Sequence, residues 1–526
     1  MGLLSIILTV TYVVFFLGTL WYSARYNTHM LQLNGYKNKE HMKWLKTGMK
    51  RQHFVLMYLA LMLVLSILSL IINLSSWVYV FWILILIIPF TGYVLLKRSN
   101  TKKKLVFTKR VRRLIVADFI LNAIILGALY LAGSRYFLAF SPVLLTLQPF
   151  VLTFTNLLLK PVEKAVNNSF IKDAKRRLAA SPSLTVIGVT GSYGKTSLKF
   201  YLQTLLSTKY NVLVTPESFN TPMGVVRTIR EQLKSTHEIF ICEMGARHVG
   251  DIKEICDIVH PQHGVITSVG PQHLETFFNI DNVRKTKFEL ADALPKGGKL
   301  FLNADSEEIL KDERDFNKIY YGVNSTLGYH AENVVLTPLG TDFTVVSPDG
   351  EKQEFHTQLI GSINVLNIVG AISIAHSFGV DFATLKVAVR RIKPVPHRLE
   401  LKEAGAVTII DDAFNSNPVG SKAAVETLKL FDGTRILITP GMVELGEKEN
   451  ELHYKFGTYA ASCCDYILLV NKYRTGSIRQ GALDSDFPSD HLFEFDRFTE
   501  AYDFAVSINT DSHKYILLEN DLPDNY

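Results

Sequence analysis

The sequence predicts an α-helical membrane domain followed by α/β structure in two domains. Three observations support this fold class: long apolar runs occupy the first 160 residues, short β-branched segments then alternate with helix-length segments, and one such junction has a glycine-bearing pattern typical of phosphate binding. The chain has 526 residues, is 48% hydrophobic and carries a formal charge of +7. This composition argues against a disordered or wholly soluble protein.

Five apolar runs in the first 160 residues are each long enough to cross a bilayer as a helix, which needs about 20 residues. The first run has no positive charge before it and no small-residue cleavage site after it, so we interpret it as retained and not as a signal peptide. We predict a membrane domain over 1–160 with about five transmembrane helices, and a linker or interfacial helix over 161–180. The five runs are 3–22, 54–74, 77–96, 114–132 and 137–159.

The charge is distributed unevenly along the chain. Residues 1–160 hold 18 basic and 2 acidic residues, whereas the remainder holds 38 basic and 47 acidic residues. The basic residues concentrate in the loops 23–53 and 97–113, which the positive-inside rule places in the cytoplasm. This predicts a multi-pass protein of the cell membrane, with its N-terminus outside and its later domains cytoplasmic. Basic clusters beside membrane helices favour anionic lipid as the partner, so we expect no nucleic acid.

Three polar residues fall within the predicted spans. Asp118 and Asn122 lie one helical turn apart, and Gln148 lies between Pro142 and Pro149. Such groups either mark a substrate path or hydrogen-bond neighbouring helices. We favour hydrogen bonding, because so few polar groups define no transport route.

The segment 181–392 predicts one α/β domain and 393–526 a second, smaller one, with the boundary near 394–396. Short apolar, β-branched runs are expected to form buried strands, each followed by a helix-length segment, which is typical of a largely parallel sheet. The four cysteines form no Cys-x-x-Cys pair, so we expect them to be reduced packing residues. The expected strands are 184–190, 239–244, 264–269 and 299–303, then 407–411, 435–439, 466–470 and 515–518.

The clearest local signal is Val186-Ile-Gly-Val-Thr-Gly-Ser-Tyr-Gly-Lys-Thr-Ser197. An apolar strand leads into a glycine-bearing turn, and a lysine and two hydroxyl residues then open a helix. Gly191 and Gly194 allow backbone N–H groups to approach phosphate oxygens, while Lys195 reaches the terminal phosphates and Thr196 ligates Mg²⁺. A structural turn is the alternative, but the strand–turn–helix context favours nucleotide binding.

Several further motifs follow in order, and with the phosphate loop they resemble the Mur ligases, a family that forms amide bonds in bacterial cell-wall precursors. Individually most are weak, but a chance match of the whole ordered set is improbable. The motifs are Ser218-Phe-Asn-Thr-Pro-Met-Gly224, Cys242-Glu-Met-Gly-Ala-Arg-His248, Gly270-Pro-Gln-His-Leu-Glu275, Lys285-Thr-Lys-Phe-Glu289, Leu302-Asn-Ala-Asp305, Gly361-Ser-Ile-Asn-Val-Leu-Asn367, His397-Arg-Leu-Glu400, Ile410-Asp-Asp-Ala-Phe-Asn-Ser-Asn-Pro418 and Gly441-Met-Val-Glu-Leu-Gly446.

This resemblance implies a P-loop Mur-ligase central domain, a Rossmann-like C-terminal domain, and ATP and Mg²⁺ as cofactors. It implies that the catalytic residues are Lys195, Glu243, His273 and Lys287. It implies that the metal ligands are Thr196, Glu243, His273 and, if carbamylated, Lys287. It implies that the ATP-binding residues are Gly191, Ser192, Gly194, Lys195, Thr196, Ser197, Asn303, Asn364, Asn367, Arg398 and Asp411. It implies that the acceptor or donor side includes Asn220, Thr221, Asn415 and Asn417.

Each of these residues also has a purely structural interpretation. Glu243 would cap a helix, Asn364 and Asn367 would cap a helix start, Arg398 would form a surface ion pair, and His273 and Lys287 would be ordinary surface residues. A carboxylate at the C-terminal end of a parallel strand, however, lies where α/β proteins bind ligands.

The implied reaction joins an amino donor to a carboxylate through an acyl phosphate, and the motifs are most similar to the branch that adds D-alanyl-D-alanine. The chain departs from the family where membrane spans replace the usual first, soluble substrate domain. We therefore expect a cell-wall precursor acceptor that is either UDP-linked or lipid-linked, with simple anchoring as an equal alternative. Two other functions stay open: a ligase for another envelope polymer, similar to poly-γ-glutamate synthase, and a membrane ATPase or scaffold without ligase activity.

Overall fold

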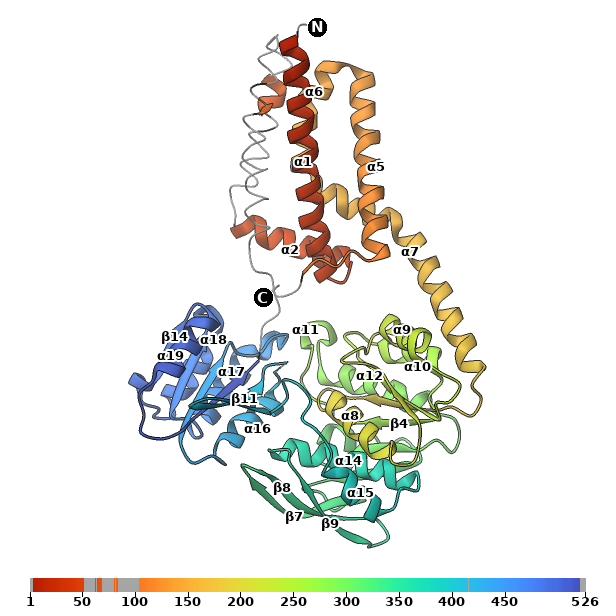
Figure 1. Cartoon of the computed structure of the whole chain (residues 1–526), viewed down its shortest axis with the longest axis vertical. Coiled ribbons are helices and arrows are strands. Elements are labelled where there is room, and N and C mark those ends of the chain that lie inside the picture. The colour runs from red at the N-terminus through yellow and green to blue at the C-terminus, as the bar shows by residue number, and fades with distance from the viewer. Residues whose placement is uncertain are drawn as a thin grey trace. The chain divides into compact units, whose positions relative to one another are not determined.

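The computed structural model describes residues 3–51, 62, 64–68, 80, 82–83, 104–414 and 416–520 (Figure 1). The chain divides into two compact units, the first extending to Asn168 and the second beginning at Ser169. The first unit is helical, and its apolar runs form helices because every backbone donor and acceptor is then paired within the segment. Its described helices are α1 (Leu3–Leu33), α2 (Asn38–Arg51), α5 (Lys109–Ala132), α6 (Ser134–Thr146) and the first part of α7 (Gln148–Ala179).

Two described helices are long and apolar enough to cross a membrane, over Ile6–Leu33 and Lys109–Ala132. The first overlaps the predicted span 3–22 over residues 6–22, and the second contains the predicted span 114–132. The fifth span was predicted as one helix over 137–159, but the chain breaks at Leu147 and the two helices α6 and α7 meet at a bend of 70°. Pro149 explains the new helix start, because proline favours the first turn of a helix. Most of the second and third spans lies outside the described residues.

Helix α7 runs without interruption from Gln148 to Ala179, so the segment 161–180, predicted as a linker or interfacial helix, is helical almost to its end. Its last turns pack into the second unit, where Ala174 is fully buried. Arg230 on α9 (Pro222–Gln232) donates from Nε to Asp173 Oδ2 at 2.9 Å and lies over the Phe170 ring at 4.1 Å. The hydrogen bond from Arg230, with further hydrogen bonds from Arg176 and Arg177, lowers the pKa of Asp173 to about 2.

The second unit contains a nine-stranded sheet in the order β2-β3-β1-β4-β5-β6-β7-β8-β9. Its strands are parallel from β2 through β7, and the last two pairings are antiparallel. The sequence predicted β1, β3, β4 and β5, whereas the hairpins after β6 and the short strand β2 were not predicted. The strands are β1 (Thr185–Thr190), β2 (Val212–Val214), β3 (Ile239–Glu243), β4 (His263–Ile266), β5 (Leu300–Asn303), β6 (Lys318–Gly322), β7 (Tyr329–Thr337), β8 (Gly340–Val346) and β9 (Lys352–Thr357).

Helices cover both faces of this sheet, which explains why its central strands are apolar throughout instead of alternating. One core lies between the sheet and α8 (Lys195–Leu206), α14 (Ser362–Ser377) and α15 (Phe382–Val389). The other lies between the sheet and α9, α10 (Asp251–Val259), α12 (Ile280–Asp292) and the end of α7. Short helices α11 (Leu274–Phe277) and α13 (Glu307–Leu310) lie in the connections.

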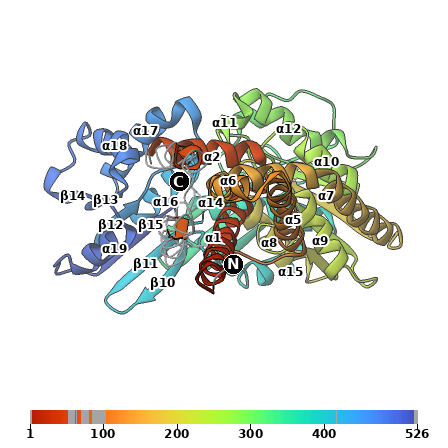
Figure 2. The same ribbon diagram turned by 90° about the horizontal axis from the view of Figure 1, so that it is seen from above.

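A second sheet follows the predicted boundary near 392–393, in the order β10-β11-β15-β12-β13-β14. All pairings are parallel except that of β10 with β11. Figure 2 shows α17 and α18 on one side of its strands and α19 on the other. The elements are β10 (Glu400–Ala404), β11 (Val407–Asp412), α16 (Pro418–Leu428), β12 (Thr434–Thr439), η1 (Gly446–Lys448), α17 (Glu449–Ala461), β13 (Tyr466–Val470), α18 (Lys472–Leu483), η2 (Ser489–His491), β14 (Leu492–Phe495), α19 (Phe498–Ser507) and β15 (Lys514–Glu519).

The attachment of α7 to α9 is open to a direct test. Arg230→Ala removes the ion pair with Asp173 and the stacking on Phe170, so we expect a Tm about 2–4 °C lower and faster proteolysis within 169–180. Arg227→Ala is the matched control, because Arg227 is on the same helix, its ion pair is with the exposed Glu231 in the next turn, and its guanidinium lies farther, 5.6 Å, from the centre of the Phe219 ring. Equal behaviour of the two variants would contradict this account of the α7 attachment.

Candidate active site

The loop between β1 and α8 has the backbone geometry of a phosphate-binding loop. Gly191 and Gly194 have φ angles of +148° and +78°. A Cβ at Gly191 would lie 2.1 Å from the Thr267 hydroxyl, and one at Gly194 would lie 2.5 Å from Asn367 Oδ1, so no larger residue fits at either position. The loop is held by Ser268, whose carbonyl accepts from Ser192 N at 2.8 Å and whose hydroxyl accepts from Tyr193 N at 2.7 Å.

Lys195, the first residue of α8, lies within this loop. Its Nζ donates to the carbonyls of Gly191 and Ser192 at 2.7 and 3.1 Å. Burial lowers its pKa to about 8, the nearby Glu243 carboxylate opposes that shift, and Arg398 adds to it. The ammonium therefore lies where the phosphates of a nucleotide would meet the loop.

Glu243 is the last residue of β3 and is 1% exposed. The parallel register pairs Val189 with Glu243, so the carboxylate lies at the same sheet edge as the phosphate loop. Its Oε1 accepts from Thr196 Oγ1 at 3.2 Å and from Asn220 Nδ2 at 3.0 Å. Burial alone would raise its pKa, but Lys199 and Lys195 hold that pKa below its usual value, so the group is a carboxylate.

Lys199 is a site residue that sequence reasoning missed. It is fully buried, and its Nζ lies 2.9 Å from Glu243 Oε2 while also donating to the carbonyl of Glu217. The available signal was a lysine one helical turn after Lys195, flanked in sequence by Leu198 and Phe200. A buried lysine needs a partner of opposite charge, and Glu243 is that partner.

Lys287 and His273 lie in electrostatic range of this group. Lys287 on α12 is 1% exposed, and burial together with the charge of Lys195 lowers its pKa well below the usual value. Burial lowers the pKa of His273, and the charge of Lys287 makes a smaller contribution in the same direction. A lysine whose neutral amine is favoured has the protonation state that reaction with CO₂ to form a carbamate requires.

His273 also forms part of a contact between the two α/β domains, through Glu444. The imidazole Nδ1 contacts Glu444 Oε2, and Leu274 N donates to the Glu444 carbonyl at 3.1 Å. Arg247 Nη2 lies 3.3 Å from Glu444 Oε1. Both His273 and Glu444 have positive φ angles, 53° and 64°. Glu444 holds the imidazole in the way that carboxylates hold histidines that ligate metals. The motif 441–446 contains Glu444 but does not indicate this role.

Arg398 enters the site from the second sheet. It precedes β10, and its Nη2 donates to Thr196 Oγ1 at 3.4 Å. The guanidinium lies 4.6 Å from the centre of the Phe414 ring. Burial lowers its pKa, while Glu243 and Asp412 favour the charged form. Arg398 thus adds a cation from the second domain beside the phosphate loop.

The other residues predicted to bind ATP form hydrogen bonds to protein groups near the phosphate loop. Asn303 donates to the Thr267 carbonyl at 2.9 Å, Asn364 accepts from the Tyr201 hydroxyl at 2.7 Å, and Asn367 donates to the Ile363 carbonyl at 2.9 Å. Asp411 accepts from Lys402 and from His397, the latter at 2.8 Å. Their roles toward ATP stay predictions, as does that of Ser197, a buried residue in the first turn of α8.

The residues predicted for the acceptor or donor side separate into two groups. Asn220 lies in the site, because its amide donates to Glu243. Thr221 caps α9 by accepting from Gly224 N at 3.3 Å, and Asn417 caps α16 by accepting from Gly420 N at 2.8 Å. Asn415 lies outside the described residues.

The site fits Mg²⁺ by the chemistry of its donors. Within the described part of the chain no group of three or more His, Cys, Asp or Glu side chains is placed to hold a metal. The fit therefore depends on the Thr196 hydroxyl and the Glu243 carboxylate, which are hard oxygen ligands 3.2 Å apart, with water and phosphate oxygens completing the set. A carbamate on Lys287 would add a further oxygen ligand.

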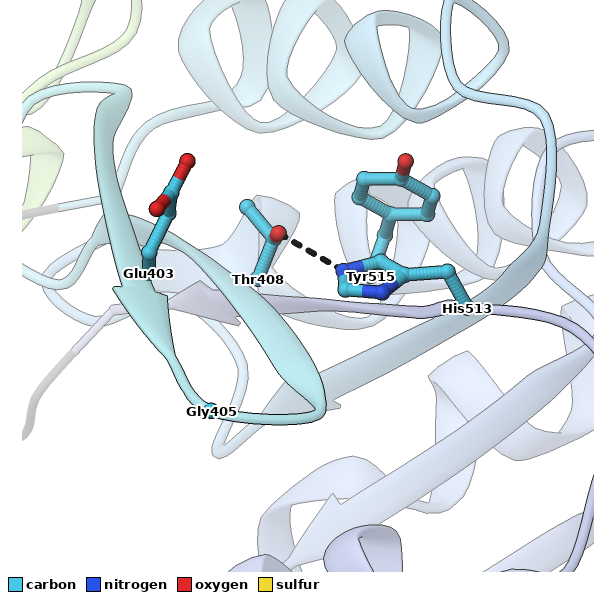
Figure 3. A pocket seen from close by; sticks show the side chains of 5 residues that line it. All are labelled: Glu403, Gly405, Thr408, His513 and Tyr515. Atoms are coloured by element: carbon cyan, nitrogen blue, oxygen red, sulfur yellow. Dashed lines mark hydrogen bonds between the residues drawn. The ribbon is translucent and has the colours of Figure 1, made fainter.

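A surface hollow elsewhere on the second sheet contains none of these residues (Figure 3). It is lined by Glu403, Gly405, Thr408, His513 and Tyr515, and Thr408 Oγ1 lies 2.8 Å from His513 Nε2. The candidate site is the sheet edge at Glu243, where both domains supply charged groups.

Comparison with known proteins supports this assignment. Residues 189–375 match the Mur ligase middle domain and residues 397–519 match the Mur ligase, glutamate ligase domain. The UDP-N-acetylmuramoyl-tripeptide--D-alanyl-D-alanine ligase of Bacillus subtilis is 30% identical over 337 residues, covering 62% of this chain and 71% of that protein. The Escherichia coli protein of the same name is 30% identical over 293 residues, covering 55% of this chain and 64% of that protein.

Solved structures show the same similarity. MurF ligase from Thermotoga maritima in complex with ADP superposes with a TM-score of 0.60 at 25% identity, covering 68% of this chain and 80% of that one. MurF from Acinetobacter baumannii has a TM-score of 0.62 at 23% identity, covering 68% and 77% of the two chains. The latter likeness concerns the fold alone.

The role of Lys287 can be tested with a neighbouring lysine as control. We expect Lys287→Ala to lower amide formation at least about 10-fold, because it removes the group that would carry a carbamate ligand. Lys285→Ala should leave the rate unchanged, since Lys285 is exposed on the same helix two residues away. The rate is measured as amide product by mass spectrometry. Unchanged activity of Lys287→Ala would contradict a carbamate at this position.

Glu444 is expected to act as a positioning residue for His273. Glu444→Gln keeps the side-chain shape but removes the charge that holds His273 and Arg247, so we expect the apparent Mg²⁺ affinity to fall about 10-fold or more. The measurement is a Mg²⁺ titration of ATP turnover together with Mg²⁺-dependent ADP binding. Glu447→Gln, an exposed substitution three residues away, is the control and should behave as wild type.

Proposed function

Because the chain belongs to the Mur ligase family, we propose that it joins an amino donor to the carboxylate of a cell-wall precursor presented at a membrane. It is an ATP-dependent ligase, and its cofactors are ATP and Mg²⁺. The observation that carries the proposal is the buried Lys195–Lys199–Glu243–Thr196 group, which borders a phosphate loop and receives Arg398 from the second domain.

The chemistry requires negative oxygens to be held and neutralised in two steps. An oxygen of the acceptor carboxylate attacks the γ-phosphorus of ATP, the bond to the ADP oxygen breaks, and an acyl phosphate forms. The neutral amine of the donor then attacks the acyl carbon, phosphate leaves, and the amine nitrogen loses a proton. Bound Mg²⁺ supplies charge neutralisation, with Thr196 and Glu243 as its protein ligands.

The chain's own residues account for phosphate positioning. Backbone N–H groups of the loop and the Lys195 ammonium face the phosphates, as in other phosphate loops. Arg398 places a guanidinium beside Thr196, and its bidentate donors suit phosphoryl oxygens. Because Arg398 belongs to the second α/β domain, the arrangement of cations is complete only when the two domains are in contact.

We propose D-alanyl-D-alanine as the donor and a muropeptide as the acceptor. The support is that the curated relatives above bear this activity in their names and match 62% and 55% of this chain. The E. coli match spans slightly less than two thirds of that protein, and residues 1–188 precede both family matches. The first unit therefore lies outside the two matched domains. Whether the acceptor is UDP-linked or lipid-linked depends on what this first unit does.

The first unit supports a membrane location. Its candidate spans are apolar, and α2 has Lys39, Lys43 and Lys46 on a helix that also carries Met42, Trp44 and Leu45. We propose a multi-pass protein with its N-terminus outside, its ligase domains in the cytoplasm and anionic lipid at its basic loops. Such a protein can receive a lipid-linked acceptor, and an anchor that leaves a UDP-linked acceptor as substrate is the alternative.

The deciding experiment supplies the detergent-solubilised full-length protein with Mg²⁺-ATP, D-alanyl-D-alanine and either the UDP-linked or the lipid-linked muramyl tripeptide. We expect a new amide by mass spectrometry with the lipid-linked acceptor, and at least about 10-fold less with the UDP-linked one. Equal product from both would reduce the first unit to an anchor. Lys195→Ala is the negative control.

Absence of product from both acceptors, while ATP still binds, would overturn the D-alanyl-D-alanine assignment. In that case other amino donors are offered with the same acceptors. A parallel alkaline carbonate extraction of membranes tests insertion of the first unit separately from catalysis.

A further inference from the structure

A broken helix in the first unit places polar groups among apolar ones. Helix α6 ends at Thr146 and α7 begins at Gln148, with a 70° bend between them. Pro142 and Pro149 lack backbone donors on either side of this break. Where helices are interrupted within a membrane, the freed polar groups are tolerated only if protein groups, water or a bound ion satisfy them.

Asp118 of α5 lies against this break with its side chain fully buried. Gln148 Nε2 donates to Asp118 Oδ2, and Thr155 Oγ1 donates to Oδ1 at 3.4 Å. One turn along α5, Asn122 Nδ2 donates to the main-chain carbonyl of Asp118 at 2.8 Å. The side chains of Asn122, Gln148 and Thr155 are also at most 2% exposed.

Hydrogen bonds engage the amide nitrogens of this cluster, Gln148 between helices and Asn122 within α5, but not the amide oxygens. Asn122 Oδ1 and Gln148 Oε1 are buried and have no hydrogen-bond partner within the described residues. The Gln148 amide nitrogen is bonded to the Asp118 carboxylate, and the Asn122 amide nitrogen is bonded to the Asp118 main-chain carbonyl, so Asn122 lies one helical turn from Asp118 on the same face of α5. No Lys, Arg or His in the described part of the chain is within ion-pair distance of Asp118. The cluster thus offers acceptor oxygens and one negative charge without a matching cation.

We propose that Asp118, Asn122 and Gln148 form a binding site for a monovalent alkali cation, Na⁺ or K⁺. All three available ligands are hard oxygens, which suit alkali and alkaline-earth ions and not the softer transition metals. A single carboxylate balances one positive charge, whereas protein sites for divalent ions generally combine several carboxylates. Anions are excluded, because the open positions are all hydrogen-bond acceptors.

A bound cation would solve the energetic problem that the cluster presents. An isolated carboxylate among apolar helices costs several kcal/mol unless it is paired or protonated, and intramembrane ionisable residues are typically functional for that reason. The ion would also join α5 to the first residue of α7, the helix that continues to Ala179. This inference rests on the proposed membrane insertion of the first unit.

The test measures the Tm of the full-length protein in nanodiscs while NaCl, KCl or N-methyl-D-glucamine chloride is varied at constant ionic strength. We expect a saturable rise of at least about 2 °C with Na⁺ or K⁺ and none with the organic cation, since only a bound ion stabilises by mass action. Asp118→Asn and Gln148→Leu should abolish the rise. Thr153→Val should keep it, because the Thr153 hydroxyl donates to the Pro149 carbonyl on the same helix and takes no part in the Asp118 cluster.

Equal Tm values in all three salts would overturn the proposal. Infrared difference spectra of the wild-type protein give a second readout that needs no variant: a cation-dependent carboxylate band supports the site, and a protonated carboxylic acid insensitive to cations overturns it. Release of the full-length protein from membranes by alkaline carbonate would instead contradict the proposed membrane location. Failure of the cation site and failure of the membrane location are therefore distinguishable.

Discussion

The site depends on the buried carboxylate of Glu243. Burying one charge at the end of β3 is unfavourable unless opposite charges and donors surround it, and Lys199, Thr196 and Asn220 supply them. Two of these partners come from the helix that follows the phosphate loop and one comes from the segment before α9. The same set of interactions therefore fixes the positions of the phosphate loop, helix α8 and the end of β3 relative to one another.

Contacts between the two α/β domains complete the arrangement. Arg398 reaches Thr196, and Glu444 holds both His273 and Arg247. Each contact joins a charged or polar group of one domain to a residue of the candidate site in the other, so the full set of charges depends on contact between the domains. Such coupling suits a reaction whose acyl phosphate must be kept from water.

The division of charge along the chain matches the division of the fold. The basic excess lies with the apolar helices of the first unit, and the acidic excess lies with the two α/β domains. Helix α7 contributes to both units, because its end is packed in the second unit by Ala174 and by the Asp173–Arg230 pair.

The sequence by itself determined the parts of this protein whose signal is local. Glycine in the phosphate loop, apolar runs of span length, and the central strands of both sheets were predictable, because each follows from hydrophobic periodicity or from a backbone conformation that only glycine adopts. The break at Leu147, the added hairpins β7–β9 and the roles of Lys199 and Glu444 were decided by tertiary structure. Buried ion pairs and inter-domain contacts join residues from 44 to 202 positions apart, and no local pattern specifies which partner folding will bring near.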